Sequence, residues 1–222
     1  NLEKTDIYEL IDYKDGYQKS IPSIFIPTTH GTGSEVTMWG TIWNMKGKKY
    51  SISNPGLYPT VAILDGSLSL SLPLDISVIT TMDALSHSFE AIWNKNANNT
   101  SNNLAISAIC SILKNLPLLK EVPSNLKIRN ELLEASTMAG LAFSNTKTAA
   151  SHSISYPLTI HYGIPHGLAS SISLLPLLDI NGHLIEDSLN QICEKNEITM
   201  NILKQNIKDF PVGVVSYRLN KW

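Results

Sequence analysis

The sequence predicts an α/β region followed by an all-helical region. Two observations support this fold class. Up to about residue 72, short apolar runs alternate with Gly and Asn, as in strands joined by turns. From about Pro73 onward, apolar residues recur three and four positions apart, which is the spacing of a helix. We therefore expect an α/β domain in residues 1–72 and a helical domain in residues 73–222.

Three strands are expected in the first region, at residues 23–27, 41–43 and 60–65. Each is a short run of β-branched, aromatic or other apolar residues, and glycine and asparagine lie between the runs. This pattern is typical of the edge of an α/β domain rather than of a complete sheet.

The second region contains five stretches with helical spacing, at residues 76–93, 104–119, 129–143, 170–178 and 184–193. Pro117 and Pro123 bracket the expected end of the second stretch, because proline interrupts the hydrogen-bond ladder of a helix. The Gly163-Ile164-Pro165 turn is expected to break the chain just before His166.

Composition and charge exclude several functional classes. Hydrophobic residues make up 43% of the chain and charged residues 16%, enough apolar material for a buried core. The net charge is -2 and no basic run occurs, so we expect no nucleic-acid partner. The absence of an apolar signal core or spanning segment predicts a cytoplasmic protein with no membrane partner. The isolated Cys110 and Cys193 favour buried, reduced thiols.

Asp83 and His87 form the first candidate for chemistry. They lie four positions apart, which places both on one face of a helix, where they can hold one ion. A surface ion pair is the alternative interpretation of such a pattern. The apolar neighbours Leu85 and Phe89 weigh against it, because they leave the helix few exposed faces.

His152 and His166 form the second candidate, fourteen positions apart around a segment that contains a proline and a reversing turn. A helix followed by such a turn could bring both imidazoles to one point. By themselves, two histidines at this distance are more often a cap and a surface residue. Combined with Asp83 and His87, however, they make a set of one carboxylate and three imidazoles without cysteine, which is typical of a catalytic divalent metal site.

A loop rich in threonine and glycine follows the first expected strand. Its glycines allow backbone N–H groups to turn toward an anion, and its hydroxyls offer further donors, so it could bind a pyrophosphate. The loop matches neither of the common glycine-rich phosphate motifs, and a purely structural turn is the alternative. The residues concerned are Thr28, Thr29, Gly31, Thr32, Gly33 and Ser34.

Taken in order, the motifs TTHGTGSEVT, PTVAILD, TTMDALSHSFEA and the His152-x13-His166-Gly167 pattern resemble the iron-containing (group III) alcohol dehydrogenases. The resemblance runs from about Ile21 to Leu178 and implies a dehydroquinate-synthase-like fold. In that fold, residues 1–72 would be the remainder of a nucleotide-binding domain. Residues 73–222 would be a helical metal-binding domain, C-terminally incomplete, in a chain truncated at both ends.

The resemblance also implies roles for particular residues. The family places a lysine near the nicotinamide ribose, which falls on Lys49, although a solvated hairpin tip is an equal alternative there. Many members have a second histidine four residues after the third ligand, where this chain has Tyr156, the candidate for substrate orientation. The Thr/Gly loop carries over as cofactor contacts. The implied metal ligands are Asp83, His87, His152 and His166.

The expected activity is hydride transfer between NAD or NADP and a small alcohol or aldehyde, at a bound divalent metal. Family habit suggests Fe(II), while Zn and other ions suit the same ligands. Residues 155–159 resemble the subgroup that includes phosphonoacetaldehyde reductases, and a homodimer is expected. The alternatives are an enzyme like glycerol dehydrogenase or dehydroquinate synthase, and a truncated, inactive metal-binding remnant, because the Gly-Gly-Gly-Ser phosphate loop would lie upstream of Asn1.

Overall fold

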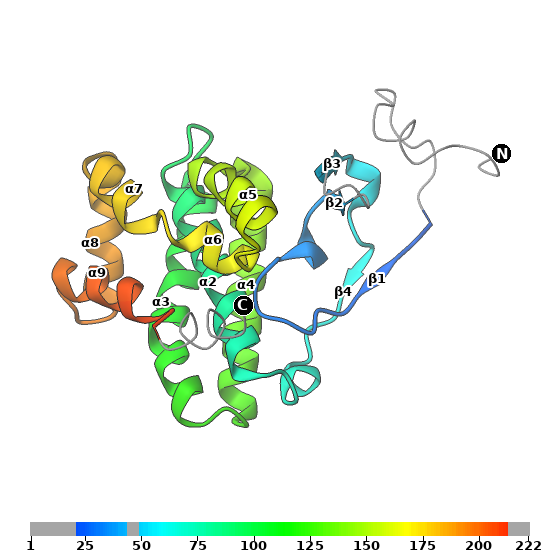
Figure 1. Ribbon diagram of the computed structural model, residues 1–222, viewed down its shortest axis with the longest axis horizontal. Helices are drawn as coiled ribbons and strands as arrows, with labels where there is room; N and C mark the ends of the chain where they lie inside the picture. The colour runs from blue at the N-terminus through cyan, green and yellow to red at the C-terminus, as the bar shows by residue number, and fades with distance from the viewer. Residues whose placement is uncertain (1–20, 44–48, 213–222) are drawn as a thin grey trace.

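The computed structural model describes residues 21–43 and 49–212, and Figure 1 shows the strands gathered on one side and the helices on the other. The short strands β1 (Ile24–Phe25) and β4 (Val61–Ala62) pair in parallel. Strands β2 (Trp39–Trp43) and β3 (Lys49–Ser53) form an antiparallel hairpin. Each of the three predicted strand regions contains a strand.

Strand β3 was not predicted, although a weak signal exists. Tyr50 and Ile52 alternate with serines, which is the period of a strand, and they pair with Ile42 and Gly40 of β2. The run is short and carries only two large apolar residues. Its assignment as a strand therefore depends on the partner strand rather than on its own composition.

Eight α-helices follow in the described chain, all after residue 73. They are α2 (Leu74–Ile92), α3 (Asn99–Glu121), α4 (Leu126–Thr146), α5 (Ala150–Tyr162), α6 (His166–Ser171), α7 (Leu174–Asn181), α8 (Glu186–Lys195) and α9 (Met200–Asp209). The predicted stretch 170–178 is divided between α6 and α7, and α9 was not predicted. The assignment of residues 1–72 and 73–222 to two domains stays a prediction.

The expectation that Pro117 and Pro123 bracket the end of the second helix is confirmed, although the helix runs past the first of these prolines. Pro117 lies inside α3, which continues to Glu121, and Pro123 follows the end of the helix. Leu116 and Leu119 flank the proline and are fully buried in the core. Their burial offsets the hydrogen bond that Pro117 cannot make, since each buried leucine contributes about 2 kcal/mol.

Helix α2 occupies the centre of the helical region, and its residues from Ser77 to Ile92 are almost all buried. Helices α3, α4 and α6 pack around it. Asn98 and Ser101 form a capping box at the start of α3, and Asn125 caps α4. A helix buried on every side places its polar side chains in a low-dielectric interior, where each of them needs a partner or a ligand.

The Thr/Gly loop joins the strand region to this helical core through close backbone contacts. A Cβ atom at Gly33 would lie 2.5 Å from the Gly140 Cα of α4, and one at Gly31 would lie 2.6 Å from the carbonyl oxygen of Thr80 in α2. Glu35 accepts a hydrogen bond from the Thr137 hydroxyl at 2.7 Å. Gly33 also adopts a left-handed conformation, with φ of 58°. These glycines therefore have a packing role in the fold.

His30 in the same loop is completely buried, and its Nε2 lies 3.1 Å from the Ser69 hydroxyl. Burial, with a smaller contribution from the Arg129 guanidinium, lowers the pKa of His30 from its ordinary value of 6.5 to about 4. The folded chain therefore disfavours the imidazolium that the unfolded chain accepts below pH 6.5. The stability that the neutral His30 contributes is fully present above that pH and is lost as the pH falls toward 4.

Because of His30, we expect the free energy of unfolding to be smaller at pH 5 than at pH 7.5 by on the order of 2 kcal/mol. Urea unfolding of the wild type and of His30→Gln at both pH values measures this difference, because the glutamine amide is polar, as the imidazole is, but does not titrate. His161→Gln is the matched control, since His161 is exposed. Equal pH dependence in the wild type and His30→Gln would show that His30 is accessible to protons in the folded state.

Within the described residues, no single helix is both long and apolar enough to cross a membrane. Residues His166–Leu184 and α8 have the length and composition of a membrane span only when taken together, and the pair is bent by 112°.

Candidate metal centre

Three acidic or imidazole side chains lie along one face of α2. Asp83, His87 and Glu90 are spaced by four and three positions, so they point to the same side of the helix. All three are buried, with exposed fractions of 4%, 5% and 0%. Such burial rules out the alternative of a solvated surface ion pair for Asp83 and His87.

The other two predicted ligands come from α5 and α6. Gly163 ends α5 in a left-handed conformation, and Pro165 precedes His166, the first residue of α6. The predicted break before His166 is therefore confirmed. The two helices pack on each other, which turns His166 back toward His152 of α5. Asp83, His152 and His166 each offer one ligand atom, and these atoms lie within 4.8 Å of one another.

The distances within this group fit a bound divalent ion. Asp83 Oδ1 lies 3.4 Å from His152 Nε2 and 3.7 Å from His166 Nε2. Two ligands that each lie about 2.1 Å from one ion in a tetrahedral site are themselves about 3.4 Å apart. His152 Nε2 is buried and has no hydrogen-bond partner among the described residues, despite its approach to Asp83. A cation between these atoms would satisfy both the nitrogen and the carboxylate.

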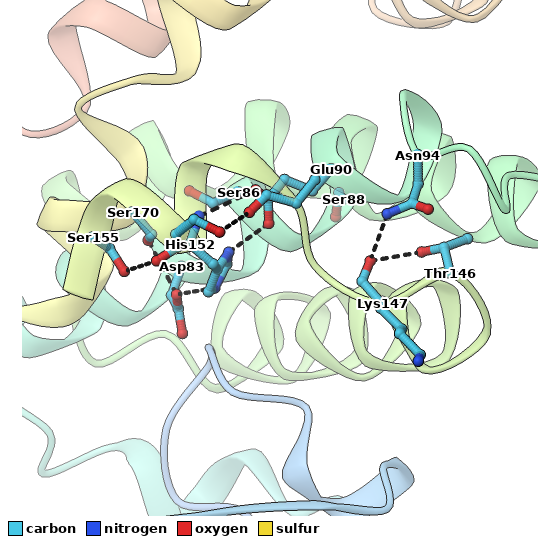
Figure 2. Close-up of polar contacts among 12 residues, drawn as sticks. Asp83, Ser86, Ser88, Glu90, Asn94, Thr146, Lys147, His152, Ser155 and Ser170 are labelled. Carbon is cyan, nitrogen blue, oxygen red and sulfur yellow. Dashed lines mark hydrogen bonds and ion pairs between the residues drawn. The ribbon is translucent and has the colours of Figure 1, made fainter. Parts of the chain in front are cut away.

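Each member of the group has a polar partner on its outer side, as Figure 2 shows for Asp83 and His152. The Ser170 hydroxyl donates to Asp83 Oδ1 at 3.1 Å. Glu90 Oε2 lies 2.6 Å from His152 Nδ1, and its Oε1 accepts the backbone N–H of His152 at 3.1 Å. The Ser155 hydroxyl lies 3.4 Å from His166 Nδ1.

His87 lies beside the group rather than inside it. Its ring stacks between those of Phe143 and His152, with centroid distances of 4.1 and 4.4 Å. Its nitrogens do not join the three ligand atoms that lie within 4.8 Å of one another, yet its Nδ1 is buried without a hydrogen-bond partner in the described chain. Trp39 of β2 also stacks on Phe143, with ring centroids 5.4 Å apart.

The electrostatics of the site favour one negative carboxylate among imidazoles. Burial alone would raise the pKa of Asp83, but the imidazoles of His87, His152 and His166 hold it well below its usual range. Burial lowers the pKa of His87 to about 4 against the opposing effect of Asp83, so this ring is neutral at pH 7. Burial lowers the pKa of His152, but the neighbouring carboxylates of Asp83 and Glu90 outweigh this effect and raise the pKa to about 9.

Tyr156 lies one helical turn after His152, and its ring is parallel to that of His166 with centroids 6.4 Å apart. Burial, followed by the charges of Glu90 and Asp83, raises the pKa of its phenol. The phenol is therefore protonated at neutral pH and can act as a hydrogen-bond donor. Its contact with substrate stays a prediction.

The residues of the Thr/Gly loop differ in their exposure. Thr28, Thr32 and Ser34 are exposed and Thr29 is half-buried, whereas Gly31 and Gly33 are buried. The Ser34 hydroxyl donates to Thr32 Oγ1 at 2.8 Å. The backbone of Lys49 pairs with Trp43 in the β2–β3 hairpin, while its side chain lies outside the described residues. The cofactor-binding role of all these residues stays a prediction.

Two family descriptions match the chain in succession. Residues 2–66 match the iron-containing alcohol dehydrogenase family, and residues 77–209 match the C-terminal part of the Fe-containing alcohol dehydrogenase family. This chain belongs to the iron-containing alcohol dehydrogenase family. The resemblance that the sequence motifs indicated is therefore confirmed.

Individual relatives agree with this membership. The chain is 37% identical over 176 residues to the probable alcohol dehydrogenase EutG of Escherichia coli K12, covering 79% of this chain and 45% of EutG. It is 38% identical over 159 residues to the 1-propanol dehydrogenase PduQ of Citrobacter freundii, covering 71% of this chain and 43% of PduQ. The chain thus spans somewhat less than half the length of these curated relatives.

Two solved structures show the same fold. The sulfoacetaldehyde reductase of Bifidobacterium kashiwanohense, solved in complex with NAD+, aligns with a TM-score of 0.88 and 36% identity, covering 96% of this chain and 57% of that one. A 1,3-propanediol oxidoreductase aligns with a TM-score of 0.80 and 29% identity, covering 87% and 53%. The predicted fold class, partial α/β followed by all-helical, is confirmed.

Glu90 is the residue beside the three candidate ligands that the sequence analysis missed. A signal was present, because Glu90 follows His87 by three positions and Asp83 by seven, which continues the same face of α2. The spacing of these residues predicts that Glu90 lies on the same face of α2, but only the packing of α5 on α2 shows which histidine the carboxylate contacts.

Proposed function

We propose that the full-length protein is a metal-dependent, NAD(P)-linked alcohol dehydrogenase that interconverts a small aldehyde and its alcohol. The observation that carries the proposal is the convergence of Asp83 Oδ1 with Nε2 of His152 and of His166, in a family of iron-containing dehydrogenases. His87 is proposed as the fourth ligand, since its neutral ring lies against that of His152.

When bound, the ion would polarise the carbonyl oxygen of the substrate and the nicotinamide would supply the hydride. The residues of this chain would hold the ion and orient the substrate. Asp83 supplies the one negative charge among the proposed ligands, so a divalent site keeps a net positive charge. The family name supports iron, while the same ligand chemistry suits zinc.

The exposed hydroxyls of the Thr/Gly loop are proposed contacts for the dinucleotide. The proposed cofactor-binding residues are those expected from the sequence: Thr28, Thr29, Gly31, Thr32, Gly33, Ser34 and Lys49. Three of the four hydroxyl side chains are exposed at the surface, and the buried glycines hold the loop against α2 and α4. The NAD+ complex of the sulfoacetaldehyde reductase supports NAD for this chain.

We propose a small aldehyde that carries an anionic group as the substrate class. The segment at residues 155–159 resembles phosphonoacetaldehyde reductases, and the similar structure from Bifidobacterium kashiwanohense is a sulfoacetaldehyde reductase. Relatives that act on uncharged alcohols, such as 1-propanol dehydrogenase, define the competing class.

The test is a metal analysis followed by a substrate screen of the full-length protein. We expect one divalent ion per chain and oxidation of NADH or NADPH with short aldehydes, fastest with the anionic ones. Metal binding without turnover would favour the inactive remnant, and turnover without bound metal would contradict the proposed mechanism. The homodimer, the cytoplasmic location and the absence of nucleic-acid and membrane partners stay predictions.

Tyr156 is the proposed substrate-orienting residue, because its protonated phenol lies beside His166. We expect Tyr156→Phe to lower kcat/KM about 2- to 10-fold through the loss of one hydrogen bond, with the metal content unchanged. Steady-state kinetics with the preferred aldehyde measures this change. Unaltered kcat and KM would assign Tyr156 to packing, and loss of metal would assign it to the ligand shell.

A further inference from the structure

Glu90 makes two contacts with a single residue of another helix. Its Oε2 lies 2.6 Å from the ring Nδ1 of His152, and its Oε1 accepts the backbone N–H of the same residue. Glu90 belongs to α2 and is completely buried, while His152 belongs to the first turn of α5. One carboxylate thus fixes both the backbone and the ring of a proposed metal ligand (Figure 2).

The backbone contact replaces a helix cap. The residue before α5 is Ala149, whose side chain cannot accept a hydrogen bond. The first N–H groups of a helix have no partners inside it, and a negative charge near them is favourable. Glu90 therefore caps α5 from the neighbouring helix, which anchors the turn that carries His152.

The ring contact determines which imidazole nitrogen is available. An ionised carboxylate only accepts hydrogen bonds, so the His152 nitrogen facing Glu90 must carry a proton. A metal ion displaces the proton from the nitrogen that it binds, so with Nδ1 protonated toward Glu90 the ligand atom is Nε2, which lies 3.4 Å from Asp83 Oδ1. Metal-binding histidines are commonly oriented by a carboxylate in this way.

We propose that Glu90 is the positioning residue of the metal centre, where it holds His152 in the tautomer that presents Nε2 to the ion. The inference rests on the proposed metal site. It adds an outer carboxylate to the ligands that the sequence motifs indicated, and it explains why α2 buries a second acidic residue two turns after Asp83.

Glu90→Gln separates positioning from packing. Glutamine has nearly the same shape and retains one acceptor oxygen, which can still accept the backbone N–H of His152. Its amide NH2 would then face Nδ1 and favour the opposite tautomer, in which Nε2 is protonated. The cap on α5 is preserved while the presentation of Nε2 is reversed.

Glu35→Gln is the matched control. Glu35 is also a buried glutamate, with a 4% exposed fraction, and it also accepts one side-chain hydrogen bond, from Thr137. It is not among the residues that contact the group of Asp83, His152 and His166. The same chemical change is therefore made in a similar environment away from the ligands.

The experiment is a calorimetric zinc titration of the full-length wild type, Glu90→Gln and Glu35→Gln, with circular dichroism and histidine ¹⁵N NMR of the zinc-bound forms. We expect Glu90→Gln to bind zinc roughly 10- to 100-fold more weakly, with helix content retained and Glu35→Gln unchanged. In the wild type, the ¹⁵N shifts should show His152 coordinated through Nε2 and protonated at Nδ1.

The possible results distinguish the two claims. Wild-type affinity in Glu90→Gln would overturn the positioning role and leave the metal site standing. Equal weakening in both variants, or loss of helix content, would show that Glu90 is only structural. If the wild type bound no zinc, and no iron or cobalt either, the proposed function and this inference would both be wrong.

Discussion

Asp83→Asn should remove the bound metal from the full-length protein, from about one ion per chain to less than about a tenth. Asp83 is the only carboxylate of the proposed ligand set, and its Oδ1 lies 3.4 Å from Nε2 of His152 and 3.7 Å from Nε2 of His166. Asparagine keeps the shape but not the charge, so the site loses the anion that offsets a divalent cation. Elemental analysis of the purified protein, by plasma mass spectrometry, gives the stoichiometry.

The histidine variants test whether the ligands act as one unit. His152→Ala and His166→Ala should lose metal to the same extent as Asp83→Asn, because a site with a missing ligand loses both a bond and its geometry. His161→Ala and His183→Ala are the controls, since both residues are exposed. Metal retained in Asp83→Asn, together with metal retained in His166→Ala, would contradict the centre that the structure indicates.

The position of His87 fits two roles, so a separate variant is needed to distinguish them. Its ring stacks on Phe143, which is a packing role, and its Nδ1 is buried without a partner in the described chain, which suits a ligand. His87→Phe keeps an aromatic ring in the stack and removes the nitrogens. Loss of metal in this variant would assign His87 to the ligand set, and retention would leave a site of three protein ligands.

The sequence predicted the parts of this site that depend on short-range periodicity. Asp83 and His87 share a face because a helix repeats every 3.6 residues, and the apolar neighbours of the pair predicted its burial. The break before His166 followed from glycine and proline chemistry. These properties belong to single segments, so a single sequence contains them.

Contacts between segments could not be predicted in the same way. The closeness of His152 to Asp83 rested on family resemblance, since spacing along the chain does not determine how α5 packs on α2. The same limit applies to Glu90, whose partner is 62 positions away. Proline chemistry bracketed the end of α3 between Pro117 and Pro123, but it could not place that end at Glu121, because the buried leucines beside Pro117 continue the helix past it.

Gly167→Ala should displace α6 and separate His166 from Asp83. A Cβ atom at Gly167 would lie 2.0 Å from the carbonyl oxygen of Ile79 in α2, and 3.3 Å from the Asp83 Cβ. Helix α2 is buried between other helices and cannot give way, so α6 must move. We expect a loss of about 3 kcal/mol or more in unfolding free energy, at the upper end for overpacking, and a loss of bound metal.

Urea unfolding and elemental analysis of Gly167→Ala measure both effects, and Gly182→Ala is the matched control. Gly182 has φ of -54°, which any residue adopts, and a Cβ atom there would meet only the Leu189 side chain at 3.7 Å, an ordinary contact. This control should keep its metal and unfold within about 0.5 kcal/mol of the wild type. If Gly167→Ala behaved in the same way, the close approach of α6 to α2 would not be what places His166 in the metal centre.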